Sequence, residues 1–516
     1  MRTRKLAVWF SILSVAFVLA PYSHAIPAFS RQYGTSCTTC HIDFPKLNDF
    51  GKAFKDAGFK FPKNDEDFIK VPPVMLGAPA QKDMFPHTVW PGTIPGMPQI
   101  GLRFNQYFQY TGKSANNYNQ TPVGPAGTLQ SPNVPRTDFE PGFFSIFTAG
   151  NFGSDIAFWV DDDISVSGAN ANGALGDAYL RFVNIGRLFK LPTDALTLRV
   201  GQFEPDLPFT QARSINISPY DIYTEANIGT SSQNVNNVSS LQDAGHGVEF
   251  SGGHQYGGYH YSLAIVDQNT SGNTAAAPNV PSPTGGSAGG VGFFSDSNFK
   301  DFYGRFSYRF NLEKDAASRN EIQAAGPSGP RDHTYLNIGT FYFYGRSAQR
   351  FSGFAPNGET AAVITAHEPF YRVGGDFSFN YRTFNLFGLY MYGHDHDVLL
   401  NSGFTGFLPG PPANFNGGFL EADYLMLPWV MAIMRWDRVQ SSADFLNQAG
   451  SGNYFSPEGT TRDRITPGVQ FLIHANIKAS FEYQFRPQQA LTYDENGNAV
   501  NPFRTNTATA GLEFVY

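Results

Sequence analysis

The chain is poor in cysteine, in charge and in long apolar runs, and each shortage excludes a class of protein. Only two cysteines occur in 516 residues, which excludes a scaffold held together by several disulfides. Charged residues make up 15% of the chain and the net charge is −7, which argues against a nucleic-acid partner. Beyond the first 25 residues, no apolar run is long enough for a transmembrane helix.

The first 25 residues are those of an exported protein. Three basic residues precede an uncharged apolar run at 6–20, and small residues, Ser23 and Ala25, follow where a signal peptidase reads the chain. We expect residues 1–25 to be a secretory signal peptide that is cleaved after Ala25. An uncleaved membrane anchor is the alternative, but the apolar run is short for a span. Cleavage would change the net charge from −7 to −10, because three basic residues are lost.

Glycine and aromatic residues are abundant, with 53 Gly, 49 Phe and 25 Tyr. In an exported chain with few charges, this composition is typical of an outer-membrane β-barrel. Apolar and polar residues alternate with a period of two in 101–110, 477–485 and 507–516. Strands with one apolar and one polar face separate lipid from water. A soluble β-sandwich also alternates, so the loops have to distinguish the two folds.

About sixteen segments show this alternation, near 98–110, 141–150, 153–165, 176–186, 195–204, 243–251, 256–267, 298–310, 333–345, 367–380, 382–394, 416–426, 428–438, 462–473, 475–485 and 505–516. Connections after even-numbered segments are mostly short, whereas those after odd-numbered segments are mostly long, as in 111–140, 205–242 and 268–297. Short turns on one rim and long outward loops on the other are the outer-membrane pattern. The sequence therefore predicts an all-β fold, an antiparallel barrel of about 16 strands over residues 98–516. The even number of strands places the first and the last residue of the barrel segment on the same, periplasmic side.

Between the signal peptide and the first strand, residues 26–97 form a small, mainly irregular and proline-rich segment. One helix is predicted over 45–57, where proline suits the first turn and Gly58 gives a stop signal. Its apolar stripe is formed by Leu47, Phe50 and Phe54.

Cys37, Cys40 and His41 form a Cys-x-x-Cys-His motif that contains every cysteine of the chain. The two sulfurs can form thioethers to the vinyl groups of a haem, and His41 can bind the iron as an axial ligand. A disulfide or a thioredoxin-like redox dithiol would use the same spacing. The histidine directly after the second cysteine favours haem. The sequence thus predicts a c-type haem domain over 26–97 with one covalent haem c.

The sixth ligand of the iron has several candidates, of which Met75 and His87 are favoured over Met84 and Met97. A methionine ligand would raise the reduction potential, a histidine would lower it, and an open position would allow small molecules to bind.

Two further groups of polar residues could carry function. Asp161–Asp163 and His394–His396 are weak candidates for cation sites on the outer side. Five arginines at presumed inward positions would wet the interior, or alternatively line an anion path or meet the haem propionates: Arg103, Arg181, Arg199, Arg305 and Arg309. The sequence contains no nucleophile elbow, phosphate loop or zinc-protease motif.

A known family shares the residues around the cysteines. The chain reads Ala28-Phe29-Ser30-Arg31-Gln32-Tyr33-Gly34, then Cys37-Thr38-Thr39-Cys40-His41, then Phe44-Pro45-Lys46-Leu47-Asn48-Asp49-Phe50-Gly51-Lys52-Ala53-Phe54-Lys55. This stretch resembles the fused monohaem cytochrome–porins of the outer membrane, whose best-known members oxidise ferrous iron. The resemblance is close over about 28–60 and architectural over the barrel. It implies a haem domain at the periplasmic mouth or inside the lumen. The final Tyr516 also resembles the C-terminal signal of outer-membrane barrels.

The resemblance implies an outer-membrane protein that carries electrons, with Fe(II) oxidation as its redox chemistry. Its favoured donor is extracellular iron, and its favoured acceptor is a periplasmic c-type cytochrome or another electron carrier. The alternative is a solute porin whose haem-bearing domain is a plug or a sensor. In both cases the partners include outer-membrane lipid and exclude nucleic acid.

Overall fold

The computed structural model describes the parts of the chain on which the following sections rest. They are residues 28–70, 74–75, 83–84, 93–94, 100–111, 121–123, 128–130, 137–152, 155–165, 173–210, 213–224, 241, 244–267, 299–312, 333–354, 360–396, 399–401, 407–409, 412–441, 461–486 and 506–516. The expected signal peptide lies outside these residues.

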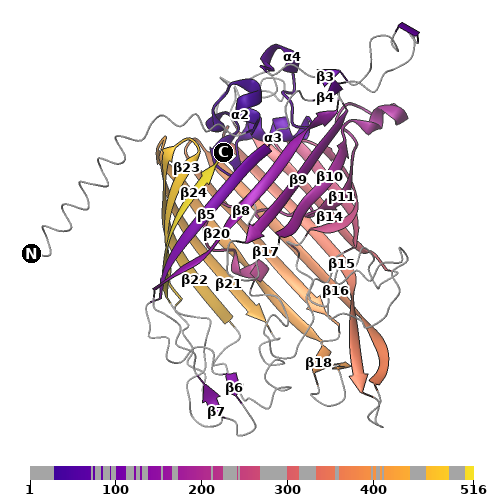
Figure 1. The fold of residues 1–516 in the computed structure, drawn as a ribbon, viewed down its shortest axis with the longest axis vertical. Coiled ribbons are helices and arrows are strands. Elements are labelled where there is room, and N and C mark those ends of the chain that lie inside the picture. The colour runs from indigo at the N-terminus through magenta and orange to yellow at the C-terminus, as the bar shows by residue number, and fades with distance from the viewer. Residues whose placement is uncertain are drawn as a thin grey trace, which may run out of the picture.

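Sixteen antiparallel strands close into one barrel, as the sequence predicts (Figure 1). Each barrel strand pairs with the barrel strands before and after it in the chain, and the last strand pairs with the first to close the sheet. The strands are β5 (Ile100–Thr111), β8 (Thr137–Phe152), β9 (Ile156–Ser165), β10 (Gly173–Phe182), β11 (Thr197–Phe203), β12 (Gly245–Gly253), β13 (Gly258–Asp267), β14 (Asp301–Asn311), β15 (Tyr335–Phe354), β16 (Thr360–Tyr381), β17 (Phe384–Asp395), β20 (Ala413–Leu427), β21 (Val430–Ser441), β22 (Thr461–His474), β23 (Ile477–Gln484) and β24 (Thr507–Val515).

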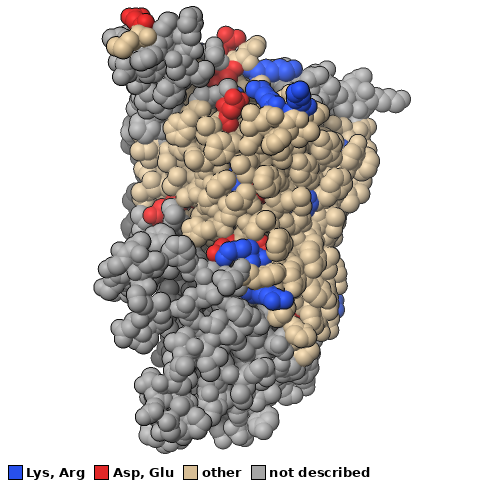
Figure 2. Space-filling model, turned by 90° about the vertical axis from the view of Figure 1, so that its right-hand side faces the viewer, with Lys and Arg blue, Asp and Glu red and all other residues tan. Residues whose placement is uncertain are grey.

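The two faces of the barrel differ in polarity. In β14, Asp301 and Arg305 are buried inside, whereas Phe302 and Phe306 are 45% and 51% exposed outside. Figure 2 shows a broad band almost free of charge on the outer face, with Lys, Arg, Asp and Glu gathered along its edges. Closure leaves no sheet edge unpaired, and an apolar exterior matches hydrocarbon. This is the structure of a barrel that crosses a lipid bilayer.

The N-terminal helices lie at one end of the barrel, near the C-terminus of the chain (Figure 1). They are α2 (Ala28–Tyr33), the 3-10 turn η1 (Cys37–Thr39), α3 (Asp49–Asp56) and α4 (Asp65–Phe68). The small pairs β6 (Thr121–Val123) with β7 (Thr128–Gln130) and β18 (Leu399–Asn401) with β19 (Phe407–Pro409) lie at the opposite end of the molecule (Figure 1). Within the described residues, no helix has the length and apolar character needed to cross a membrane.

The helix that the sequence predicts over 45–57 is α3, and it begins later than Pro45 suggests. The side chain of Asn48 accepts a hydrogen bond from the Gly51 amide at 2.8 Å and caps α3, so the helix starts at Asp49. Leu47 belongs to β2 (Lys46–Leu47), which pairs with β1 (His41–Asp43), and not to the helical stripe. The predicted start at residue 45 was therefore wrong, because the amide cap outweighs the proline. The stop at Gly58 is confirmed, since this residue has φ +83°.

Two strands are longer than the alternation indicates. The segments 333–345 and 367–380 mark only the membrane part of β15 and β16, which continue as a paired hairpin beyond the barrel (Figure 1). The antiparallel pairing continues there as far as Phe354 opposite Thr360. Because the residues outside the bilayer need no apolar face, the period of two is lost from the sequence while the strands persist.

Candidate functional site at the barrel mouth

The cysteine motif folds into one tight turn. Cys37 begins η1, and the Cys40 amide donates to the Cys37 carbonyl at 3.2 Å. The Ser36 hydroxyl accepts from the Thr38 amide at 3.3 Å and caps this turn. Both cysteines are free thiols, and His41 follows at once as the first residue of β1. Thus the two sulfurs and the imidazole come from five consecutive residues of one compact element.

The ring of His41 is oriented by a backbone carbonyl. Its Nδ1 lies 3.2 Å from the oxygen of Pro45, to which it can donate a hydrogen bond. Metal-binding histidines commonly donate their second ring N–H in this way, which leaves Nε2 for the metal. Burial lowers the pKa of His41 to about 4. The imidazole is therefore neutral at neutral pH, as a metal ligand must be.

The thiols are unlike those of a redox dithiol. Burial raises the pKa of the Cys40 thiol to about 12, and the neighbouring Cys37 adds to this shift. Burial also raises the pKa of Cys37. Catalytic cysteines have lowered pKa values in electropositive surroundings, because the thiolate is the reactive form. The surroundings of this motif therefore argue against a thioredoxin-like role.

An aromatic cluster packs beside the motif. Tyr33 stacks on Phe61 with ring centroids 4.3 Å apart, and Phe50 meets Phe61 edge-on at 5.1 Å. Cys40 packs against the same cluster. Gly51 lies so close to the turn that a Cβ there would overlap the Cys40 carbonyl oxygen. Helix α3 thus holds the cysteine turn directly against an apolar wall.

These residues fit a covalent haem. Cys37 and Cys40 supply free thiols, His41 supplies an oriented neutral imidazole, and the aromatic cluster supplies an apolar surface beside them. A haem bound there would supply one-electron exchange between Fe(II) and Fe(III). Met75 lies in β3 (Val74–Met75), and only its backbone is described. His87 and Met97 lie outside the described residues, and Met84 is 70% exposed. The sixth ligand stays a prediction.

Residues 28–70, which we call the N-terminal unit, are anchored to the barrel by a buried ion pair. Arg309 of β14 donates from both Nη atoms to the carboxylate of Asp49, at 2.6 Å each. Both side chains are 1% exposed. The guanidinium also lies 3.5 Å from the ring centroid of Tyr335, and Lys52 lies 3.2 Å from Asp49. These attractions hold the pKa of Asp49 well below its usual range.

A second anchor lies on other strands. Lys46 Nζ donates to Asp423 of β20 at 2.6 Å and to Asn385 of β17 at 2.9 Å. Lys478 of β23 donates to the carbonyl of Phe44 at 2.7 Å. The chain on either side of Pro45 is thus bound to three strands by charge-assisted hydrogen bonds, which are stronger than neutral ones.

A third anchor completes the ring. Arg181 of β10 donates to the carbonyl of Lys55 at 2.6 Å, and Phe59 packs against Trp159 of β9 with centroids 5.6 Å apart. Together the anchors lie on β9, β10, β14, β17, β20 and β23, which are distributed around the whole barrel. A unit held from all sides in this way spans the mouth of the barrel.

A second segment, residues 204–210 and 213–224, lies inside the barrel, and we call it the inner segment. Its helix α6 (Asp221–Thr224) is visible within the barrel in Figure 1. Ser218 donates from its hydroxyl to Glu482 of β23 at 2.6 Å and accepts from Arg435 of β21 at 2.6 Å. Arg464 of β22 lies 2.9 Å from Asp221. The interpretation of 205–242 as wholly an outward loop was therefore wrong.

The inner segment differs in composition from the other long connections. Stretches such as 268–297 consist mainly of small and polar residues, whereas 204–224 contains buried Leu207, Ile215, Tyr220 and Ile222. Apolar side chains in a loop need a partner surface, and this was the available signal that the segment folds inward.

The N-terminal unit and the inner segment meet. Ile42 packs against a buried cluster formed by Ile215, Met431 and Ile433. The N-terminal unit at the mouth and the inner segment are therefore in contact inside the barrel.

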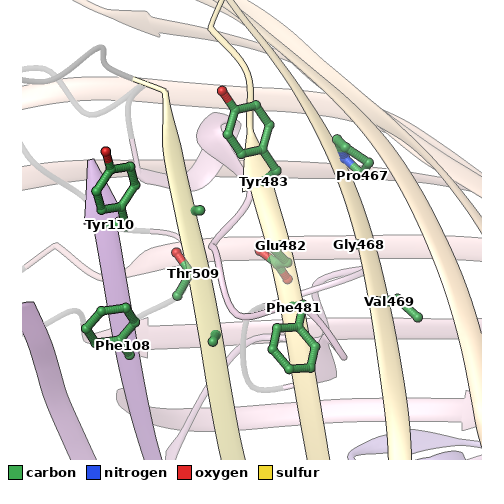
Figure 3. A pocket seen from close by; sticks show the side chains of 11 residues that line it. Phe108, Tyr110, Pro467, Gly468, Val469, Phe481, Glu482, Tyr483 and Thr509 are labelled. Carbon is green, nitrogen blue, oxygen red and sulfur yellow. The ribbon is translucent and has the colours of Figure 1, made fainter. Parts of the chain in front are cut away.

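A groove of about 500 Å³ lies on the outer face of the barrel, between the aromatic pairs of β5 and β23 (Figure 3). Its exposed walls face lipid and are formed by Phe108, Tyr110, Phe481 and Tyr483.

The five arginines predicted to face inward do so, but each has a specific partner. Three of them pair with acids of other strands: Arg103 with Glu513 and Arg199 with Glu249 on adjacent strands, and Arg305 with Asp376 of β16, two strands away. The remaining two are the anchors of the N-terminal unit, Arg181 and Arg309. These arginines therefore make specific structural contacts, beyond simply giving the lumen a polar lining.

Neither weak candidate for a cation site is assembled. Asp161 accepts from the Trp159 indole at 2.9 Å, and Asp395 is buried against Arg372 at 2.9 Å. Across the described part of the chain, no group of three or more His, Cys, Asp or Glu residues could hold a metal ion.

Known proteins resemble this chain only in architecture. An anion-selective porin from Comamonas acidovorans has a TM-score of 0.44 and 10% identity, over 81% of this chain and 98% of the porin. The outer-membrane channel DcaP of Acinetobacter baumannii has a TM-score of 0.44 and 10% identity, over 81% and 96%. OprB of Pseudomonas putida has a TM-score of 0.45 and 10% identity, over 81% and 94%. No protein-family model and no curated protein matches the sequence. At such low sequence identity the likeness carries no functional argument. The assignment of a closed barrel rests on the strand order of this chain.

Proposed function

We propose that this chain is a porin-type barrel of the outer membrane whose periplasmic mouth is closed by a haem-bearing plug. The N-terminal unit is the plug, and Cys37, Cys40 and His41 are the residues that hold the haem. The observation that supports this proposal is the ring of anchors from strands around the whole barrel. Of the two functions expected from the sequence, the porin with a haem-bearing plug has the better support, because the closed barrel and the anchored N-terminal unit favour it without any electron donor or acceptor.

Electron transfer across the outer membrane is the second candidate, and one observation favours it. The cysteine motif belongs to the plug itself, and the inner segment lies in the lumen in contact with the plug. A solute must displace both to pass, whereas an electron does not need an open path. Extracellular Fe(II) is the proposed donor and a periplasmic c-type cytochrome the proposed acceptor.

The haem and the barrel can be tested on the purified protein. Haem stain should remain on the polypeptide after boiling in detergent, because thioethers survive denaturation. Unboiled protein should migrate faster than boiled protein, because a closed barrel stays compact. Loss of all stain on boiling would refute the covalent haem, and recovery of the native protein as a soluble species without detergent would refute the membrane placement.

Liposomes distinguish the two functions. Electron transfer predicts that external Fe(II) reduces an enclosed haem acceptor, and that His41→Ala stops this while the barrel stays folded. A plugged porin predicts solute flux that rises when the plug is loosened, with no electron delivery. Fast solute flux together with a haem that neither Fe(II) nor a periplasmic cytochrome reduces would eliminate the electron-transfer candidate.

A further inference from the structure

The turn between β10 and β11 carries large apolar side chains that the fold does not bury. It contains the 3-10 turn η3 (Ile185–Phe189) and lies at the same end of the barrel as the N-terminal unit, since Gly58 approaches Val183. Leu188 is 78% exposed and Phe189 is 67% exposed. Leu191 directly after η3 is 44% exposed. Three such residues on one short turn form a compact apolar surface.

This turn has a fixed structure. The side chain of Asn184 accepts from the Asp194 amide at 2.7 Å and bridges its two ends. The Gly186 amide donates to Leu196 at 3.3 Å, and the Leu191 amide donates to Gly186 at 3.0 Å. The exposed side chains are therefore presented by an internally bonded scaffold.

The turn leans over the outer face of the barrel. Tyr261 of β13 donates from its hydroxyl to the Ala195 carbonyl at 2.8 Å. Tyr261 belongs to the outward-facing series of β13, together with Tyr259 at 47% exposure and Leu263 at 57%. In Figure 1 a short helical turn projects past the barrel wall at this end. The apolar surface of the turn thus continues the lipid-facing band of the barrel.

Two cations flank the apolar residues. Arg187 lies 3.5 Å from Asp155, but its side chain is 60% exposed, so this pair is weak. Lys190 is exposed and has no ion pair among the described residues. Figure 2 shows Lys and Arg side chains, with Asp and Glu beside them, at the upper edge of the uncharged band. Long cationic side chains beside apolar ones suit the boundary between lipid phosphates and acyl chains.

We propose that this turn is a lipid anchor at the membrane interface. Leu188, Phe189 and Leu191 enter the acyl boundary of the leaflet at the plugged end, and Arg187 and Lys190 bind phospholipid phosphates. The proposal rests on the proposed membrane placement of the barrel. Continuity with the lipid-facing band favours lipid over a second copy of the chain or another protein.

The test uses tryptophan fluorescence of the full-length protein in vesicles of phosphatidylcholine and phosphatidylglycerol. Phe189→Trp places a probe on the turn, and Lys63→Trp places a matched probe on an exposed site of the N-terminal unit. The native Trp436 is exposed on the outer face of β21, Trp429 is exposed in the turn before β21, and both report barrel insertion. Lipids brominated near the headgroup or near the chain end measure the depth of each probe.

The added emission of Phe189→Trp should be blue-shifted and quenched most by bromine near the headgroup, whereas that of Lys63→Trp should be unquenched. Adding Arg187→Gln and Lys190→Gln to Phe189→Trp should reduce this shallow quenching, because the phosphate contacts are lost. An unquenched Phe189→Trp beside quenched native tryptophans would overturn the anchor alone. A blue shift without quenching in a dimer would show that a second copy covers the turn. If the native tryptophans are also unquenched, the membrane placement fails as well.

Discussion

Removal of the Asp49 carboxylate should release the N-terminal unit without unfolding the barrel. Asp49→Asn keeps the size of the side chain but leaves the guanidinium of Arg309 buried without its counter-charge, and this group is only 1% exposed. Breaking a buried ion pair by removing one partner costs about 3–5 kcal/mol. At about 1.4 kcal/mol per factor of ten, the undocked population should rise roughly 100- to 4,000-fold.

Hydrogen exchange of α3 measures this population. Its amides exchange only when the unit opens, so their protection should fall by the same factor while that of the barrel strands stays unchanged. Asp67→Asn is the matched control, because Asp67 is an exposed carboxylate of the same unit. Arg309→Gln combined with Asp49→Asn should cost less than the sum of the single changes, because no buried guanidinium is then left without its counter-charge. Protection of α3 that stays within about threefold of the wild type, when about 100-fold is expected, would refute the docking role of this pair.

Three further changes test the site and its docking. Burial, followed by the charges of Arg213 and Arg199, lowers the pKa of Lys55 from 10.5 to about 8. Because the docked unit disfavours the charged form of Lys55, the hydrogen-exchange protection of α3 should increase as the pH rises from about 8 to 10.5. The variant Lys55→Met should remove this pH dependence. Replacing both Cys37 and Cys40 by alanine should abolish the haem stain that survives boiling, whereas a stain equal to the wild type would rule out thioethers at these two positions. Gly51→Ala should destabilise the N-terminal unit by about 1–3 kcal/mol, since its Cβ would overlap Cys40, and unchanged thermal release of the unit would contradict this packing.

Local pattern alone accounted for much of this molecule. Alternation with a period of two predicted the sixteen strands, because every strand must present one face to lipid and the other to a polar interior. The Cys-x-x-Cys-His motif is equally local, since the haem site that it predicts depends only on the spacing of three residues in the chain. Errors arose where two local signals competed, as at the start of α3, where the Asn48 cap outweighed Pro45.

Only the tertiary structure decided how the barrel is filled. Asp49 and Arg309 are 260 positions apart, and Lys46 and Asp423 are 377 apart, so neither member of a pair identifies its partner in the sequence. Likewise, the partners of the inner segment are known only from the structure, in which Ser218 binds Glu482 and Arg435 on the opposite wall of the barrel. The alternation of apolar and polar residues indicates which face of a strand meets lipid. The pairing of charges across the lumen depends instead on which strands lie opposite one another once the barrel is closed. The sequence therefore determined the barrel wall and the Cys-x-x-Cys-His motif, and closure of the sheet determined where the motif is held.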